Sequence, residues 1–305
     1  MRAASLPPWG LPALGAGLIA LALVSDTRLA VILAVWFGAW ALNAALANRS
    51  GAGATRLVVP VIFGVTLLVL WELVVQLYQI SFVILPAPSA IWARMVTETP
   101  TLWADFQQTI LKGALAGYVM GCGAAFLAAL AIDRSAFLQR GLLPVGNFIA
   151  ALPIVGTAPI FVMWFGFGWQ SKSAVVVAMV FFPMLVNCVQ GFKASDVMQR
   201  DLMRTYAASY GQTLVKLRLP TAMPFIFNGL KICTTLALIG AIVAEFFGSP
   251  TVGMGFRIKI EMGRLAMDMV WAEIAVAALA GSGFYGLVAL IEKRLTFWHP
   301  SQRRG

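Results

Sequence analysis

Long apolar runs separated by short polar segments dominate the chain. Six strong runs lie near residues 57–79, 108–132, 145–166, 172–192, 223–247 and 271–291, and a weaker pair, 9–25 and 29–47, precedes them. An α-helix needs about 20 predominantly apolar residues to cross a bilayer, and every strong run reaches that length. The period-2 alternation of a transmembrane barrel is not visible in the sequence. The pattern therefore predicts an all-α, polytopic helical membrane protein with six core transmembrane helices plus an N-terminal helical hairpin.

The N-terminal pair is the least regular part of this pattern. The run 9–25 holds 17 residues with Pro12 inside it, which is close to the lower limit for crossing a bilayer. It also resembles a signal peptide, because Arg2 precedes the apolar stretch and small residues surround Ser25. No clear small-x-small cleavage site follows, and a second apolar run comes next. We favour an uncleaved, extra hydrophobic hairpin within residues 1–56.

The distribution of Lys and Arg predicts the orientation in the membrane. With the N-terminus inside and all eight segments crossing, the inner side carries 15 and the outer side seven of the 22 basic residues. Cytoplasmic loops of membrane proteins are enriched in these residues. Omitting the first segment moves only Arg2 and Arg28, so the orientation of the core does not depend on it.

Composition supports a membrane protein and narrows its chemistry. Of the 305 residues, 60% are hydrophobic and 11% are charged, which lies outside the range of soluble domains. The net charge of +10 fits basic loops on the cytoplasmic side and does not require nucleic acid as a partner. The cysteines Cys122, Cys188 and Cys233 all lie in apolar runs, which favours small core residues over a disulfide framework.

The sequence gives no indication of a catalytic or metal centre. The single histidine, His299, lies six residues from the C-terminus, which excludes metal sites that need two histidines and argues against His-dependent nucleophilic catalysis. No Gly-Lys-Ser/Thr triplet is present, so the chain has no Walker A loop to hold ATP phosphates. We expect no enzymatic activity, no metal and no cofactor in this chain itself.

The inner loop at 193–222 is too long for a simple turn and carries an amphipathic pattern. Between Asp196 and Leu214, apolar residues recur at helical spacing, while basic side chains lie on another face. We expect a helix outside the bilayer, then a turn, then Pro220 and Pro224 at the start of the next span. Such a helix either rests on the membrane surface or docks on a cytoplasmic protein, and the pattern alone does not decide between the two.

This loop resembles the inner-loop signature of ABC importer permeases. The signature runs Glu-Ala-Ala, three residues, Gly, nine residues, Ile, one residue, Leu-Pro. Its spacing is kept here by Asp201, Leu202, Met203, Ala207, Leu217, Leu219 and Pro220. Asp201 keeps the carboxylate of the family's Glu, whereas Leu202 and Met203 enlarge the surface formed by the paired alanines, and Ala207 replaces the Gly. The resemblance implies that these residues, with Ala208, couple the chain to an ATPase subunit.

Three further stretches resemble the nitrate/sulfonate/taurine-type branch of these permeases. They are Leu85-Pro86-Ala87-Pro88-Ser89, then Ala158-Pro159-Ile160 through Trp164-Phe165-Gly166-Phe167-Gly168 with Lys172, and then Ala244-Glu245 with Gly253-Met254-Gly255. With the inner loop they cover residues 57–305. By this resemblance, 57–305 is an ABC permease transmembrane domain with a cytoplasmic coupling helix at about 196–220. Residues 1–56 lie outside the resemblance.

The resemblance also implies a function and a set of partners. It indicates the membrane-spanning permease subunit of an ATP-driven, solute-binding-protein-dependent importer in the inner membrane of a bacterium. The implied partners are two cytoplasmic ATP-binding subunits that hold ATP and Mg²⁺, an extracytoplasmic solute-binding protein, and a second permease subunit, expected to form a homodimer. Ligand selection is then expected to rest mainly on the binding protein. Residues 181–187 and 201–209 are most similar to permeases for pyrimidine-type vitamin precursors or riboflavin, with nitrate, sulfonate or taurine next.

Polar residues inside the predicted helices suggest a second candidate site and an alternative function. Asn187, Thr234 and Glu245 are candidates for lining a translocation path, or else for hydrogen bonds between helices. Ionisable groups in a membrane are functional candidates, so a secondary transporter driven by an ion gradient through Glu72 or Glu245 is the alternative. For Glu72 we favour structural pairing.

Small and aromatic residues predict where helices pack and where the bilayer ends. Gly113, Gly117 and Gly121 form a smooth strip on one face of the second core span, which predicts close packing against another helix. The sequence does not decide whether that helix belongs to the same chain or to a second copy. The aromatic residues within 164–169 predict an interfacial belt at the outer end of the third span.

Overall fold

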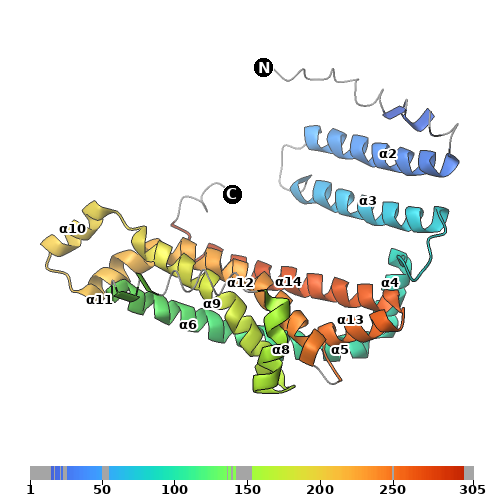
Figure 1. The fold of residues 1–305 in the computed structure, drawn as a ribbon. Helices are drawn as coiled ribbons and strands as arrows, with labels where there is room; N and C mark the ends of the chain where they lie inside the picture. Colours follow the sequence, from blue (N-terminus) through green and yellow to red (C-terminus); the bar gives the residue numbers. More distant parts are fainter. Residues whose placement is uncertain are drawn as a thin grey trace. The chain divides into compact units, whose positions relative to one another are not determined.

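Helices form all the regular structure in the described part of the chain (Figure 1). The computed structural model describes residues 15–16, 18–20, 22, 26–49, 55–135, 137–138, 140–141, 153–248 and 251–298. Contacts divide the chain into two compact units, one of residues 1–97 with 265–272 and one of residues 98–264 with 273–305. The predicted boundary between 56 and 57 rests on the resemblance and stays a prediction.

The first unit contains α2 (Thr27–Arg49), α3 (Thr55–Leu77) and α4 (Pro88–Thr97). The helices α2 and α3 are antiparallel, because the Tyr78 hydroxyl just after α3 donates to Asp26 just before α2, at 3.1 Å. The rings of Trp36 and Phe63 meet edge to face between them, with centroids 6.2 Å apart. The second N-terminal segment therefore packs on the first predicted core span.

The second unit is built from long helical rods. Its elements are α5 (Thr99–Phe106), the π-helix η1 (Gln107–Ala114), α6 (Leu115–Arg134), α8 (Ile154–Phe165), α9 (Trp169–Lys193), α10 (Val197–Thr205), α11 (Tyr210–Thr213), the π-helix η2 (Leu214–Arg218), α12 (Leu219–Gly248), α13 (Met254–Gly263) and most of α14 (Met267–Leu295). The elements α5, η1 and α6 run on without a break, and so do α11, η2 and α12.

Six helices in the described residues are long and apolar enough to cross a membrane. They are Thr27–Ala47, Val58–Leu77, Thr99–Arg134, Trp169–Lys193, Tyr210–Gly248 and Met267–Leu295. They confirm the all-α, polytopic class and the predicted runs 29–47, 57–79, 108–132, 172–192, 223–247 and 271–291. The described part of the run 145–166 is α8, whose 12 residues are too few to span a bilayer alone. The run 9–25 lies largely outside the described residues.

The helices in the two long loops begin and end at other residues than the apolar pattern indicates. The outer loop 80–107 holds α4 and α5, so the second core rod begins at Thr99, before the apolar run 108–132. A single helix was expected over 196–214, but α10 ends at Thr205. A turn follows, and the next rod begins at Tyr210 because Ser209 forms a capping box with Gln212.

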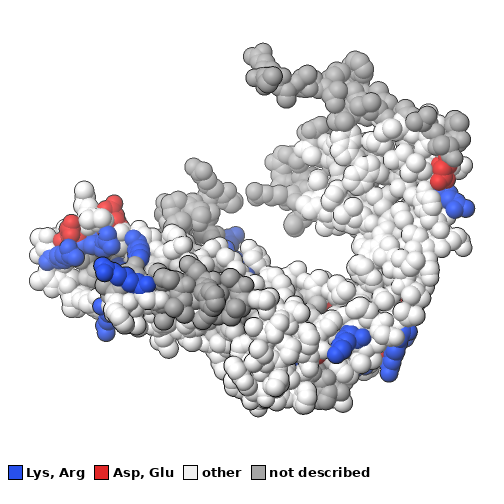
Figure 2. Space-filling view, in the orientation of Figure 1, with Lys and Arg blue, Asp and Glu red and all other residues white. Residues whose placement is uncertain are grey.

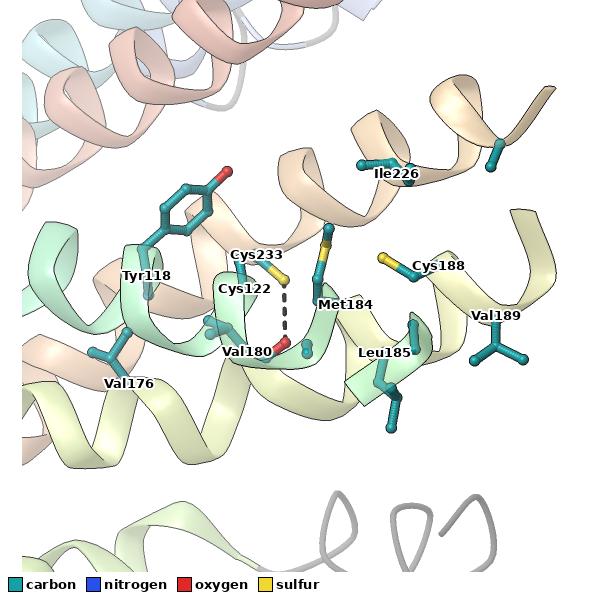
Figure 3. Packing of buried hydrophobic residues seen from close by; sticks show 14 of the residues in the cluster. Tyr118, Cys122, Val176, Val180, Met184, Leu185, Cys188, Val189, Ile226 and Cys233 are labelled. Carbon is teal, nitrogen blue, oxygen red and sulfur yellow. Dashed lines mark hydrogen bonds between the residues drawn. The ribbon is translucent and has the colours of Figure 1, made fainter. Parts of the chain in front are cut away.

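The core of the second unit lies between α6, α9 and α12 (Figure 3). Cys122, Cys188 and Cys233, one from each of these helices, are buried free thiols, as the sequence analysis predicted. The Sγ atom of Cys233 donates to the backbone oxygen of Val180 at 3.4 Å (Figure 3). The cysteines act as small core residues that let the helices approach closely.

The glycine strip of α6 packs against α9 of the same chain. A Cβ atom on Gly117 would lie 2.5 Å from Cβ of Val176, and one on Gly121 would lie 3.1 Å from Cα of Val177. Real Cβ atoms essentially never come as close as the first distance, and the second is tighter than nine in ten real Cβ contacts, so larger side chains would push the two helices apart. The close packing predicted from the strip is therefore confirmed, and the neighbouring helix is intramolecular.

Candidate functional site

The inner loop presents α10 as an exposed amphipathic helix. Asp196 begins it, because its carboxylate accepts the Met198 N–H at 2.8 Å. Every residue of α10 is exposed or half-buried, and the side chains of Met198 and Leu202 are 79% and 56% exposed. Acidic and basic side chains gather over the α10 end of the unit (Figure 2). The helix α10 itself carries the Asp201–Arg204 pair, at 3.3 Å. An apolar and charged helix left uncovered by its own chain is typical of a docking element.

The turn after α10 requires an unusual backbone conformation. Ala207 has φ of +50°, in the left-handed region that glycine adopts most easily. The turn is closed by backbone hydrogen bonds from Ala207 N–H to Arg204 and from Ala208 N–H to Met203, at 2.8 and 2.9 Å. The resemblance places a family Gly at position 207, and the geometry supplies the physical reason for it.

An ion pair fixes the segment after the turn to the helix bundle. Arg218 of η2 donates to both carboxylate oxygens of Asp133 at the end of α6, each at 2.5 Å. Arg218 also donates to the backbone oxygen of Phe192 in α9 at 3.1 Å, and the Tyr210 hydroxyl donates to Asp133 at 2.7 Å. Because a bidentate Arg–carboxylate pair has one preferred geometry, this anchor holds the base of the α10 loop against α6 and α9.

The predicted coupling residues fall into two groups. Five belong to α10 and its turn, namely Asp201, Leu202, Met203, Ala207 and Ala208, of which Met203 and Ala208 are half-buried and the others exposed. The other three, Leu217, Leu219 and Pro220, are half-buried in the rod that follows. The π-helix η2 ends next to Pro220, which has no N–H to donate to a regular helical turn.

At the opposite end of these rods, Glu245 of α12 is the centre of a buried polar network. Its side chain is 1% exposed, and its Oε2 atom accepts the Thr109 hydroxyl at 2.8 Å and the Gly255 N–H at 2.9 Å. The oxygen of the same hydroxyl accepts the Met254 N–H at 2.8 Å. Thr109 therefore bridges the carboxylate and the first residues of α13.

Asp105 of α5 forms the second half of this outer polar network. It is fully buried and accepts the Gly253 N–H at 2.6 Å and Nε of Arg257 at 2.8 Å. Burial opposes the charge of Arg257, but the hydrogen bond and the charge of Asp105 outweigh it and raise the pKa of the guanidinium. The sequence analysis did not single out Asp105 or Thr109. Asp105 lies three residues before the apolar run 108–132 and Thr109 is the second residue of that run, and neither placement signals a partner far along the chain.

The Gly253-Met254-Gly255 motif is required by the crowding around Glu245. Gly253 has φ of +134°, and a Cβ atom on it would lie 2.6 Å from Cδ of Glu245. A Cβ atom on Gly255 would overlap the backbone oxygen of Ile242. Both glycines let the backbone approach the carboxylate, so Ala244-Glu245 and the glycine motif form one structural unit.

Lys172 joins the third motif to the same end of the unit. Its ammonium group is buried and donates to the backbone oxygens of Phe167, at 2.6 Å, and of Gly248 at the end of α12. Gly166 has φ of +77°, which lets α8 end and the chain turn into α9. Lys172 therefore binds the end of the same helix that carries Glu245, three residues beyond that carboxylate.

The three candidate path residues, Asn187, Thr234 and Glu245, have separate hydrogen-bond partners in the structure. Thr234 is buried, and its hydroxyl donates to the backbone oxygen of Lys231 in its own helix at 2.7 Å. Asn187 donates to the backbone oxygen of Pro183 at 2.8 Å and accepts from Asn228 at 3.0 Å. Each residue has a different set of hydrogen-bond partners.

Glu72 lies in the first unit and has the structural partners that the sequence analysis favoured. Its carboxylate accepts the N–H and the hydroxyl of Ser89 at 3.0 and 2.7 Å, and the amide of Gln76 at 2.5 Å. Ser89 belongs to the first turn of α4 and to the Leu85–Ser89 motif. The carboxylate therefore caps α4 and explains the serine of that motif.

The chain matches the family model described as binding-protein-dependent transport system inner membrane component, over residues 117–297. That range is more than half of the chain and includes both the α10 loop and Glu245. The protein therefore belongs to this family, which consists of the permease subunits of ABC importers.

Curated relatives agree with this assignment and point to more than one solute. The chain is 32% identical over 224 residues to a probable ABC transporter permease of Haemophilus influenzae, covering 72% of this chain and 89% of that protein. It is 28% identical to a formylaminopyrimidine transport permease of Halalkalibacterium halodurans, covering 80% and 96%. It is 30% identical to a riboflavin transport system permease of Chloroflexus aurantiacus, covering 77% and 88%.

The protein is an ABC importer permease subunit, multi-pass in the inner membrane, and by family it works with ATP-binding and solute-binding components.

Proposed function

We propose that this permease imports a small solute that carries a flat heteroaromatic ring, using ATP hydrolysed by two cytoplasmic subunits that grip α10. The observation that carries the coupling proposal is α10 itself. Its apolar side chains are exposed, while the Asp133–Arg218 pair holds the base of its loop rigidly. Because the base of the α10 loop is fixed to α6 and α9, a force that an ATP-binding subunit exerts on α10 would also move these two helices.

The energy source in this proposal lies outside the chain. The sequence has no Walker A loop, so ATP and Mg²⁺ belong to the partner subunits and no cofactor belongs to the permease. Two ATP-binding subunits need two permease subunits to receive their motion, and we propose that the second one is an identical copy. Family membership does not support the alternative of a secondary transporter, and Glu72 and Glu245 both serve as hydrogen-bond acceptors in the fold.

The proposed substrate class rests on the relatives. Two of the relatives described above are named for a formylaminopyrimidine and for riboflavin, both of which carry heteroaromatic rings. Other relatives, at 27% and 28% identity, are named for aliphatic sulfonates and for taurine, which makes sulfonates the second candidate class. Choice between solutes is proposed to rest mainly on the binding protein.

Replacing Ala208 by Arg tests the coupling proposal. A bulky cation at this half-buried position of the α10 turn should abolish co-purification of the ATP-binding subunit and ATP-dependent uptake. Ala104→Arg makes the same change at an exposed position of α5, at the opposite end of the unit, and should leave both intact. Unimpaired association and uptake in Ala208→Arg would show that the inner loop is not the coupling element.

Uptake measurements test the energy source and the substrate class separately. Cells that express the complete transporter should take up labelled riboflavin or an aminopyrimidine when the ion gradients are collapsed and ATP is maintained. Uptake that stops with the gradient contradicts ATP coupling. Uptake of taurine without uptake of either ring compound contradicts the substrate class and leaves the coupling proposal standing.

A further inference from the structure

A cavity with aromatic walls lies between α6, α8 and α9. Its volume is about 500 Å³, within the range of about 300–1,000 Å³ typical of small-molecule sites. We call it the aromatic cavity. Its lining includes Met120 of α6, Phe161 and Phe165 of α8, and Trp169, Gln170 and Ser173 of α9. The sequence analysis assigned the aromatic residues of this region to an interfacial belt and identified no solute pocket in the permease.

The walls of the aromatic cavity are suited to a flat ring. The rings of Phe161 and Phe165 are nearly parallel, 16° apart in plane with centroids 6.5 Å apart, and Trp169 lies on the facing helix. Phe165 is 51% exposed, so packing within the chain leaves its ring available. Aromatic side chains stack on heteroaromatic rings whatever substituents those rings carry, since each such ring has a π-face.

Two polar side chains complete the lining, and one of them is suited to recognise the edge of a ring. Ser173 has its hydroxyl directed to the backbone oxygen of Gly113 at 3.2 Å, so its proton is already used. The Gln170 amide provides two donors and an acceptor on one group. Pyrimidine and flavin rings carry neighbouring donors and acceptors on their edges, which is the pattern that an amide matches.

The cavity is attached to the outer polar network. Trp169 and Gln170 form the first turn of α9, and two residues later Lys172 binds the backbone oxygen of Gly248. Ser173 is bonded to η1, whose Thr109 bridges to Glu245. Movement of the network would therefore change the shape of the cavity.

We propose that the aromatic cavity is a transit site that holds the flat heteroaromatic ring of the solute between Phe165 and Trp169, with Gln170 on the ring edge. The inference rests on the proposed function, because it names the place in the permease where that class of solute binds. It adds a solute site to the permease, and it predicts that the permease adds a preference for ring over aliphatic solutes to the selection made by the binding protein.

A matched pair of phenylalanines tests the site. Phe165 lines the cavity, whereas Phe167, which is 63% exposed and two residues away, does not. The complex of permease and ATP-binding subunit, purified without the solute-binding protein, is titrated with riboflavin, and the quenching of flavin fluorescence is followed. Removing one stacking ring should weaken binding by about 5-fold to 150-fold in Phe165→Ala, which corresponds to about 1–3 kcal/mol. Phe167→Ala should bind as the unchanged complex does.

Gln170→Leu provides a second readout that a loss of folding would not produce. It should weaken binding of riboflavin and of an aminopyrimidine while ATPase association and the melting temperature stay unchanged. Equal affinities in the Phe165 and Phe167 variants, with riboflavin still imported by the wild-type transporter, would overturn the site and leave the proposed function intact. Wild-type transporter that imports taurine and neither ring compound would overturn the proposed substrate class.

Discussion

At the scale of single residues, the family motifs are explained by contacts that no single motif reveals. The Glu245 carboxylate accepts the backbone N–H of Gly255, and the missing side chains of Gly253 and Gly255 let that backbone come close enough. Ser89 of the Leu85–Ser89 motif binds Glu72 through both its N–H and its hydroxyl. In both cases a buried or partly buried carboxylate is stabilised by donors from a segment that follows a helix end.

Thr109→Val should destabilise the outer polar network. Valine has the shape of threonine but leaves Glu245 and the Met254 N–H each without one partner, and an unsatisfied buried group costs about 1–3 kcal/mol. We expect a melting temperature several degrees lower in detergent. Thr97→Val is the control, because its exposed hydroxyl binds only backbone oxygens of its own helix. Equal melting temperatures for the two variants would show that the bridge contributes nothing.

Ala207→Gly and Ala207→Val should act in opposite directions. Glycine relieves the left-handed backbone at φ of +50°, which costs an L-residue about 1–2 kcal/mol, whereas a β-branched side chain increases that cost. Ala207→Gly should keep or raise the melting temperature and keep the amount of ATP-binding subunit that co-purifies. Ala207→Val should lower the melting temperature and that amount. A valine variant as stable and as well coupled as the glycine variant would contradict the assigned turn geometry.

At the scale of elements, the apolar runs predicted which helices exist but not where each begins. The second core rod begins at Thr99 and the fifth at Tyr210, both earlier than the hydrophobic runs. A capping box begins the fifth, and the Asp105–Arg257 ion pair holds the first part of the second. The predicted helix over 196–214 is broken because one residue, Ala207, adopts a left-handed conformation, and alanine gives no signal of that. The α10 surface was predictable from spacing, whereas Asp105 and Thr109 meet their partners only through the tertiary fold.

Asp133→Asn should loosen the α10 loop from the bundle. The Arg218 guanidinium would keep a half-buried charge with a weaker partner, and removing one member of a buried pair costs about 3–5 kcal/mol at most. We expect lower ATP-dependent uptake per assembled complex, together with faster proteolysis within 194–209. Asp26→Asn, which changes a carboxylate of the first unit paired with the Tyr78 hydroxyl, should change neither quantity. If the two variants behave alike, the anchor does not set the position of the loop.

At the scale of the whole molecule, the two ends of the second unit differ in character. One end presents the exposed helix α10 with its apolar and charged side chains, and the other contains the buried network of Asp105, Thr109 and Glu245, which binds the start of α13. The helices α6, α9 and α12 run between these two ends and pack closely against one another at glycine and cysteine residues. Tight packing of this kind transmits strain rather than absorbing it, which suits a subunit driven from one side of a membrane.

Cysteine cross-linking in intact membranes tests the central claim most directly, because the native thiols of Cys122, Cys188 and Cys233 are all buried. Leu202→Cys places a reactive thiol on exposed α10, and Trp103→Cys places one on an exposed position of α5 at the other end of the unit. The account predicts that a short bifunctional reagent joins Leu202→Cys, and not Trp103→Cys, to the ATP-binding subunit. Failure of Leu202→Cys to cross-link in a transporter that still imports its solute would contradict it.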